Sequence, residues 1–174
     1  MRDEKFFTES EKKCWEKLKD FNEHVLHIQD LGTTPKKHWT DASGNTADSR
    51  YFNMELKNRN QVIYVDDNSE YIASGTTNKG NTYTADNLYI EQHKVCSMLL
   101  DWICKGYEPI YINFLENCIV VFNLSRLKRR PVPEPKKIHS KGYGKMEIGT
   151  REGLFLTDAT IYDYQYNLIK RPNE

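Results

Sequence analysis

The segment Glu55-Leu56-Lys57 places a carboxylate and an ammonium two residues apart. On a β-strand, side chains two residues apart share a face, so we expect Glu55 and Lys57 side by side while Leu56 faces the core. A hard divalent cation takes oxygen ligands, which the Glu55 carboxylate and the Leu56 backbone carbonyl can supply. Lys57 would then position or deprotonate an attacking water, or stabilise charge in a phosphoryl-transfer transition state.

A third oxygen ligand is expected from Asp41, fourteen residues before Glu55, if the two segments pair as a hairpin. Asp48 competes for this role, but it lies only seven residues before Glu55, in a region rich in turn formers, so Asp41 is preferred. Taken alone, a Glu-x-Lys triplet is usually a surface ion pair. The functional interpretation therefore depends on the elements around it.

Those elements begin with a helix. A capping pair, Thr8 and Glu11, precedes apolar residues at helical spacing, and the helix should end near Gln29. Strands are predicted at 37–42, 51–57 and 61–65, with a turn over residues 43–46. The polar stretch 66–84 is expected to be a mobile flap or to hide a short strand.

A second helix is predicted from Thr84 or Asp86 to about Cys104, where Lys105-Gly106 stops it. Two apolar runs, 109–114 and 118–124, form a hairpin, and the alternating prolines after residue 130 indicate an extended segment. This order of elements predicts a mixed α/β domain. We expect a core over residues 1–125 and a basic C-terminal extension, 126–174, packed on or beside it.

Composition narrows the class of protein. The 174 residues carry 25 basic and 25 acidic side chains, so a polyanion must be met by a local patch rather than by net charge. The four cysteines and five histidines show no spacing typical of a zinc site. The charged first residues do not read as a signal peptide, and no apolar run is long enough to span a membrane, so a cytoplasmic protein is expected.

With Asp41, the Glu55-Leu56-Lys57 triplet and the segment Tyr89-Ile-Glu-Gln-His-Lys94, the chain resembles the PD-(D/E)XK nuclease superfamily from Thr8 to about Leu124. Thr40 stands where that family often has proline. The resemblance implies a restriction-endonuclease-like fold: a helix, three mixed strands, a helix and a further strand around a central sheet. It implies a Mg²⁺- or Mn²⁺-dependent DNA endonuclease, of the resolvase or restriction type found in phages and bacteria.

The resemblance also assigns roles. Asp41, Glu55 and the Leu56 carbonyl would hold the metal, and Lys57 would assist catalysis. The family's second helix often carries a Lys or Gln that touches the scissile phosphate. Both Gln92 and Lys94 match that position, and Lys94 is preferred. Three further residues are weaker candidates. They are Glu16, which is more readily explained as a solvated helix residue, Glu91, as an additional ligand, and Asp48, as above.

From Arg126 to Lys145 the chain has eight Lys or Arg residues and one acid, Glu134. This run is either a solvated edge or a DNA-binding surface. The residues assigned to DNA contact are Arg59, Lys128, Arg129, Arg130, Lys136 and Lys137. Related nucleases often work as homodimers, so that assembly is also considered. The alternatives are a catalytically inactive nucleic-acid-binding or assembly module with the same fold, and an α/β interaction domain without a nucleic-acid role.

Overall fold

The computed structural model describes residues 9–34, 41–139 and 146–173, and for 136–139 and 146–148 the backbone alone. A seven-stranded sheet forms its centre. In order across the sheet, its strands are β1 (Gly32–Thr33), β2 (Ala42–Asn45), β3 (Tyr51–Asn58), β8 (Glu108–Phe114), β9 (Ile119–Asn123), β12 (Thr160–Tyr162) and β13 (Leu168–Lys170). Strands β3 and β8 run parallel and the other neighbours antiparallel, so the predicted mixed sheet is confirmed.

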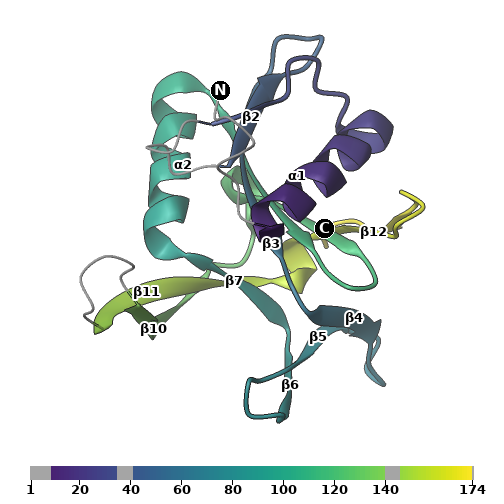
Figure 1. Ribbon diagram of the computed structural model, residues 1–174, viewed down its shortest axis with the longest axis vertical. Helices are drawn as coiled ribbons and strands as arrows, with labels where there is room; N and C mark the ends of the chain where they lie inside the picture. Colours follow the sequence, from purple (N-terminus) through teal and green to yellow (C-terminus); the bar gives the residue numbers. More distant parts are fainter. Residues whose placement is uncertain (1–8, 35–40, 140–145, 174) are drawn as a thin grey trace.

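The two α-helices cover opposite faces of this sheet (Figure 1). Helix α1 (Glu9–Phe21), which continues as a short π-helix over Asn22–Leu26, buries Cys14, Leu18 and Phe21 at helical spacing. Helix α2 (Gln92–Lys105) buries Val95 and Met98 against the other face. The mixed α/β class follows from this arrangement. Among the helices that the structure describes, none is both long and apolar enough to traverse a membrane.

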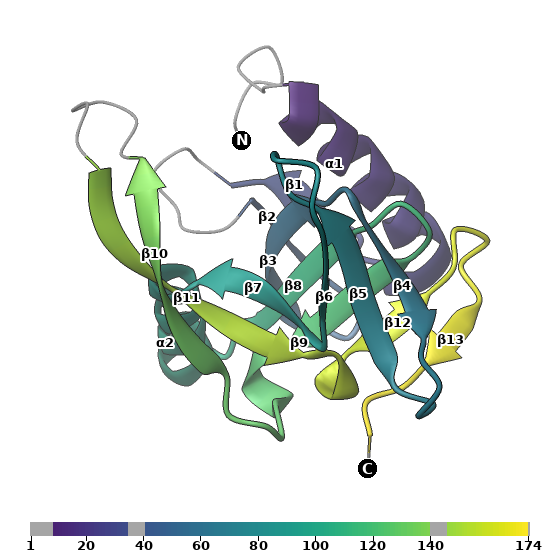
Figure 2. The same cartoon turned by 90° about the horizontal axis from the view of Figure 1, so that it is seen from below.

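Two smaller sheets lie beside the face of the main sheet that α2 covers. Strands β4 (Gln61–Val65), β5 (Tyr71–Thr76) and β6 (Thr82–Ala85) form one of them. Strands β10 (Val132–His139), β11 (Met146–Phe155) and β7 (Asn87–Glu91) form the other. Figure 2 shows the β10–β11 hairpin and the β4–β5–β6 sheet on two sides of β7. Short 3₁₀ turns at Leu124–Arg126 and Leu156–Asp158 complete the described elements.

The hairpin that leads into β3 differs from the prediction. Residues 37–40 of the predicted strand 37–42 lie outside the described residues, and the expected turn residues Ser43, Gly44 and Asn45 belong to strand β2. A side chain at position 44 would meet Ile28 at 2.5 Å, so glycine is needed there for close packing rather than for a turn. The Asn45 backbone N–H donates to Asp30 Oδ1, 2.8 Å away. The chain turns instead at residues 46–49, where the Ser49 N–H donates to the Thr46 carbonyl.

The predicted start of the second helix, at Thr84 or Asp86, was also wrong. Residues 87–91 form strand β7, in which Leu88 and Ile90 are buried and their neighbours are not, and helix α2 begins only at Gln92. Pairing with β11, some sixty residues later, holds this segment extended. The polar stretch 66–84 contains β5 and β6, which bears out the strand alternative. Strand β4, expected in the core sheet, pairs with β5 instead.

The segment after residue 125 shares sheets with the residues before it. Strand β12 pairs with β9 in the main sheet, and β11 pairs with β7. The boundary drawn at residue 125 therefore coincides with no break in the hydrogen-bonded sheets. The predicted extended conformation of the proline-rich segment is confirmed, because it forms β10.

Candidate active site

Strand β3 places its residues on two faces as its alternation predicted. Met54 and Leu56 belong to the apolar layer beneath α1. Asn53 and Glu55 are buried toward the opposite face, where the Asn53 amide donates to Asp101 of α2 at 3.1 Å. Lys57 follows on the same face and is about one third exposed. The carboxylate and the ammonium of the triplet therefore stand next to each other, one in the interior and one at its rim.

Glu55 is a buried carboxylate, with 1% of its side chain exposed. One oxygen, Oε1, accepts from the ammonium of Lys94, while Oε2 is buried with no hydrogen-bond partner among the described residues. Burial, reinforced by the charge of Asp41 and opposed by Lys94 and Lys57, raises the pKa of Glu55 to about 8. A buried carboxylate with an unused oxygen is an unsatisfied acceptor, which favours binding of a proton or a cation.

Glu55 and three further charged side chains, Lys57, Glu91 and Lys94, form what we call the Glu55 cluster. Lys57 Nζ lies 3.8 Å from Glu55 Oε1 and 3.5 Å from Glu91 Oε1. Lys94 Nζ lies 3.7 Å from Glu91 Oε2, an oxygen that is also buried without a hydrogen-bond partner among the described residues. Burial acts to raise the pKa of Glu91, but Lys57 and Lys94 outweigh it and the pKa is lowered. The cluster thus pairs two carboxylates with two ammonium groups.

Asp41 lies just before β2, at the edge of β3. Its N–H donates to the Met54 carbonyl at 2.9 Å, and its Oδ2 accepts the Leu56 N–H at 2.8 Å. The register that pairs Ala42 with Met54 brings Asp41 opposite Glu55, as the hairpin prediction required. The N–H and C=O of one residue in an extended strand point toward the same neighbour, so the Leu56 carbonyl is directed to the edge where Asp41 sits.

The weaker candidates lie in different places. Glu91 joins the cluster, but Asp48 is exposed in the turn and accepts from Thr46 and Arg50. The pairing of Asn45 with Tyr51 puts that turn at least four residues from Glu55 along β3, roughly 13 Å in an extended strand. Asp48 is therefore not a neighbour of Glu55.

Gln92 and Glu16 are likewise engaged elsewhere. The Gln92 amide donates to Glu152 of β11 at 2.7 Å, so Lys94 rather than Gln92 makes the contact with Glu55. Glu16 is an exposed residue of α1, the helix on the other face of the sheet. Neither residue is placed in the Glu55 cluster.

The basic residues have partners of their own. The Arg59 guanidinium donates to Asn113 at 2.6 Å, to the Tyr111 hydroxyl at 2.6 Å and to the Tyr89 carbonyl. Lys128 donates to the Asn173 carbonyl at 2.8 Å, and the Arg129 guanidinium lies 3.5 Å from the Phe155 ring centroid.

The remaining three candidates lie further along the run. Arg130 is exposed, and Lys136 and Lys137 lie on β10. Contact of the six basic residues with DNA remains a prediction.

Glu91 was predicted only as a weaker candidate, and the two ion pairs that it makes, with Lys57 and Lys94, were not predicted. A signal was present, because Glu91 and Lys94 stand three residues apart where one helical turn brings side chains together. What the sequence could not show was that β7 and α2 meet at this residue. Among the described residues, no three His, Cys, Asp or Glu side chains converge into a group that could hold a metal ion unaided.

Comparisons with known proteins add little to this geometry. No protein-family model matches the chain, and no curated protein matches its sequence. Among solved structures, the chain is similar to Hjc, a Holliday junction resolvase from the archaeal hyperthermophile Archaeoglobus fulgidus. The two are 13% identical, the match covers 80% of this chain and 82% of that one, and the TM-score is 0.44. At this level of similarity the site is assigned from the chain's own residues.

Proposed function

We propose that the protein is a metal-dependent DNA endonuclease, with Asp41, Glu55 and the Leu56 carbonyl as ligands of one Mg²⁺ or Mn²⁺ ion. The observation that carries the proposal is the buried Glu55 carboxylate, whose Oε2 has no hydrogen-bond partner in the described part of the chain while two lysines lie near its other oxygen. A surface ion pair, the ordinary explanation of a Glu-x-Lys triplet, would be exposed on both sides.

The donor set fits such an ion. Mg²⁺ prefers oxygen ligands and is usually held by one or two carboxylates together with substrate phosphates and waters. Asp41 and Glu55 supply the two carboxylates at one edge of β3, and the Leu56 carbonyl is directed to that edge. When bound, the ion would stabilise the negative charge that develops at the attacked phosphate. The incomplete protein ligand set agrees with an ion that also needs substrate.

The lysines would act on the substrate. Lys57, one third exposed at the rim of the cluster, is placed to orient an attacking water or to offset charge on a phosphate oxygen. Lys94 contacts Glu55 Oε1 and opposes the rise of the Glu55 pKa, so it favours the ionised carboxylate that a metal ligand requires. Glu91 lies between the two ammonium groups and fixes their positions. In this proposal the lysines are the groups that meet the phosphodiester.

The test is a cleavage assay on linear, supercoiled and branched DNA with Mg²⁺ or Mn²⁺ and with a chelator. The wild type should cleave only with metal, whereas Glu55→Gln and Lys57→Ala should lose cleavage and keep DNA binding. Glu70→Gln, which changes an exposed carboxylate outside the cluster, is the matched control and should cleave normally. Circular dichroism checks that each variant is folded.

Metal-dependent cleavage retained by both Glu55→Gln and Lys57→Ala would overturn the site. A wild type that neither binds Mn²⁺ nor cleaves any DNA, but still binds DNA, would replace the enzyme with the inactive nucleic-acid-binding module.

A further inference from the structure

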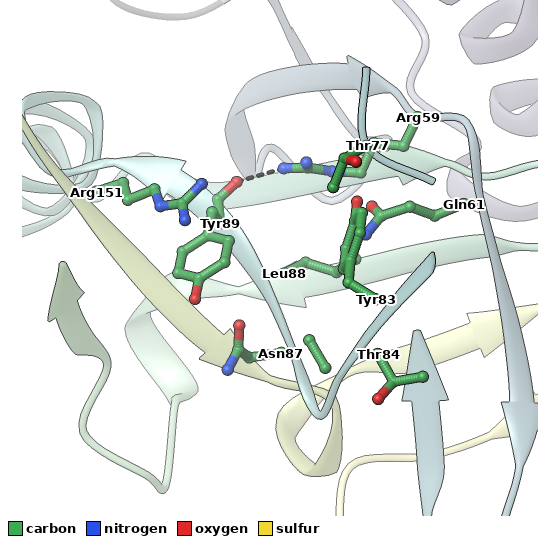
Figure 3. A pocket seen from close by; sticks show the side chains of 10 residues that line it. Arg59, Gln61, Thr77, Tyr83, Thr84, Asn87, Leu88, Tyr89 and Arg151 are labelled. Atoms are coloured by element: carbon green, nitrogen blue, oxygen red, sulfur yellow. Dashed lines mark hydrogen bonds between the residues drawn. The ribbon is translucent and has the colours of Figure 1, made fainter. Parts of the chain in front are cut away.

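A cavity of about 430 Å³ opens next to the Glu55 cluster, bounded by the β4–β5–β6 sheet, β7 and β11 (Figure 3). The residues that matter in its wall are Arg59, Gln61, Tyr83, Asn87, Tyr89 and Arg151. Its size falls in the range of small-molecule sites, and it combines aromatic rings, amides and guanidinium groups. None of these features is required by the proposed metal site.

Two strands connect the cavity to that site. On β7, Asn87, Tyr89 and Glu91 alternate with the buried Leu88 and Ile90, so their side chains lie on one face. Glu91 belongs to the Glu55 cluster, whereas Asn87 and Tyr89 line the cavity. Two residues of extended strand span roughly 7 Å, so the part of the cavity wall that β7 supplies begins about that far from Glu91 along the strand.

Strand β3 and Arg59, the residue that follows Asn58 at its end, also connect the cavity to the Glu55 cluster. Glu55, Lys57 and Arg59 share a face by the same alternation. Lys57 pairs with Glu91, and Arg59 donates to the Tyr89 carbonyl (Figure 3). A ligand that passes along this face therefore meets the charged cluster first and the cavity next.

The cavity wall contains polar atoms that lack partners. Gln61 is 8% exposed and its Oε1 is buried without a hydrogen bond among the described residues, as is Asn87 Oδ1. A buried acceptor left unpaired costs free energy, so a ligand that donates to it gains affinity. The amide of Gln or Asn offers a donor and an acceptor together, which is the pattern that matches the edge of a nucleobase.

Two tyrosine rings and two guanidinium groups also line the cavity. Tyr83, 40% exposed, and Tyr89 stand on two sides of Leu88 in Figure 3. The guanidinium of Arg151 lies 3.6 Å from the Tyr89 ring centroid and is neutralised by Glu134, 2.7 Å away. Arg59 is different, because among the described residues its hydrogen bonds go to neutral groups, Asn113, Tyr111 and the Tyr89 carbonyl. Its positive charge remains available to an anion.

We infer that this cavity receives an unpaired base of the DNA strand whose phosphate lies at the Glu55 cluster. Tyr83 supplies a stacking surface, Gln61 and Asn87 meet the base edge, and Arg59 meets the adjoining phosphate. The inference rests on the proposed nuclease function for the identity of the polymer. It adds that the substrate is DNA with an unpaired or extruded nucleotide rather than a fully paired duplex.

The test compares three DNA duplexes that differ at one position: fully paired, with a one-nucleotide bulge, and with an abasic bulge that keeps the backbone but lacks the base. Dissociation constants are measured by fluorescence anisotropy with the chelator present, so that binding is read without cleavage. Stacking of one base on an aromatic side chain corresponds to a change in affinity of about 5- to 150-fold. The wild type should therefore bind the bulge about tenfold more tightly than the abasic bulge.

Tyrosine variants test whether Tyr83 causes the difference in affinity between the bulge and the abasic bulge. Tyr83→Ala should erase the difference between the two bulges, whereas Tyr83→Phe, which keeps the ring, should retain it. Tyr64→Ala removes a similarly exposed tyrosine of β4 that is not part of the cavity wall, and should also retain it. Equal affinity of the wild type for both bulges, or a full difference in Tyr83→Ala, would overturn the inference.

Failure of the nuclease proposal would look different. A protein that binds the bulge through Tyr83 but cleaves no DNA with Mg²⁺ or Mn²⁺ would contradict the proposed activity and support the base-binding cavity. A protein that cleaves paired and bulged DNA equally, with no effect of Tyr83→Ala on binding, would contradict the cavity and support the activity.

Discussion

Lys94 places its ammonium against Glu55 Oε1, although the two residues lie thirty-nine positions apart on different elements. The contact forms because the chain leaves β3, builds β4 to β7, and returns through α2 to the parallel neighbour β8. Burial of the pair leaves Glu55 Oε2 without a partner among the described residues. The charge state of Glu55 therefore depends on Lys94 and on whatever cation or proton meets its second oxygen.

Replacing Lys94 should shift the pH dependence of cleavage. Lys94 opposes the rise of the Glu55 pKa, so Lys94→Met should raise that pKa further and move the half-maximal rate to higher pH. The measurement is a pH–rate profile for single-turnover cleavage. Lys105→Met, which removes a lysine of the same helix that pairs with Asp101, should leave the profile unchanged. An unshifted profile in Lys94→Met would mean that Lys94 does not control Glu55.

Metal affinity should depend on pH because a protonated Glu55 cannot serve as a ligand. The folded protein holds the Glu55 proton up to a pKa of about 8, above the ordinary value of 4.5, so metal binding below pH 8 must release that proton. Affinity for Mn²⁺ should rise by up to about tenfold per pH unit below this pKa and level off above it. Calorimetric titrations from pH 6 to 9 check this, and a flat affinity across pH 6 to 8 would contradict it.

Matched substitutions distinguish Asp41 from Asp48 as the carboxylate that binds the metal together with Glu55. Asp41→Asn should abolish cleavage, since Asp41 lies at the Leu56 edge and its charge acts on Glu55. Asp48→Asn should leave cleavage near the wild-type rate, because Asp48 lies in the exposed turn with Thr46 and Arg50. Initial rates at saturating Mg²⁺ are compared. The opposite ranking of the two variants would move the site to the turn.

Substitution of Gly44 in β2 should lower the free energy of unfolding, because the strand is closely packed there. Gly44→Ala forces a methyl group to within 2.5 Å of Ile28 and 3.0 Å of the Asp30 carbonyl, which should cost about 1–3 kcal/mol of unfolding free energy. Gly32→Ala, whose methyl would meet no described atom closer than the Asp30 carbonyl at 4.0 Å, should change stability by less than about 0.5 kcal/mol. Urea denaturation measures both, and equal effects would contradict the observed packing.

Local sequence patterns predicted the parts of the site that lie on one strand or on one hairpin. Alternation in β3 put Glu55 and Lys57 on one face, and hairpin pairing put Asp41 at its edge. The apolar hairpin of β8 and β9 was equally visible, because its two runs are adjacent in the chain. These features depend on neighbours in sequence, and the sequence was sufficient to predict them.

The remaining parts depend on pairing between distant segments. Residues 87–91 carry a strand because β11 pairs with them, and this pairing places Glu91 at the start of α2 beside Lys57. Read alone, Leu88 and Ile90 could be merged into the apolar stripe of the following helix. The cavity could not be predicted for the same reason, since its wall comes from four strands (β4, β6, β7 and β11) together with Arg59 and Thr77.

Anomalous diffraction from a crystal soaked in Mn²⁺ shows whether Asp41 and Glu55 hold a divalent ion. We expect a manganese peak between the Glu55 and Asp41 carboxylates, within ligand distance of the Leu56 carbonyl, and the loss of this peak in Glu55→Gln. A soaked crystal with no peak at this position, or with the same peak in Glu55→Gln, would contradict the proposed metal site.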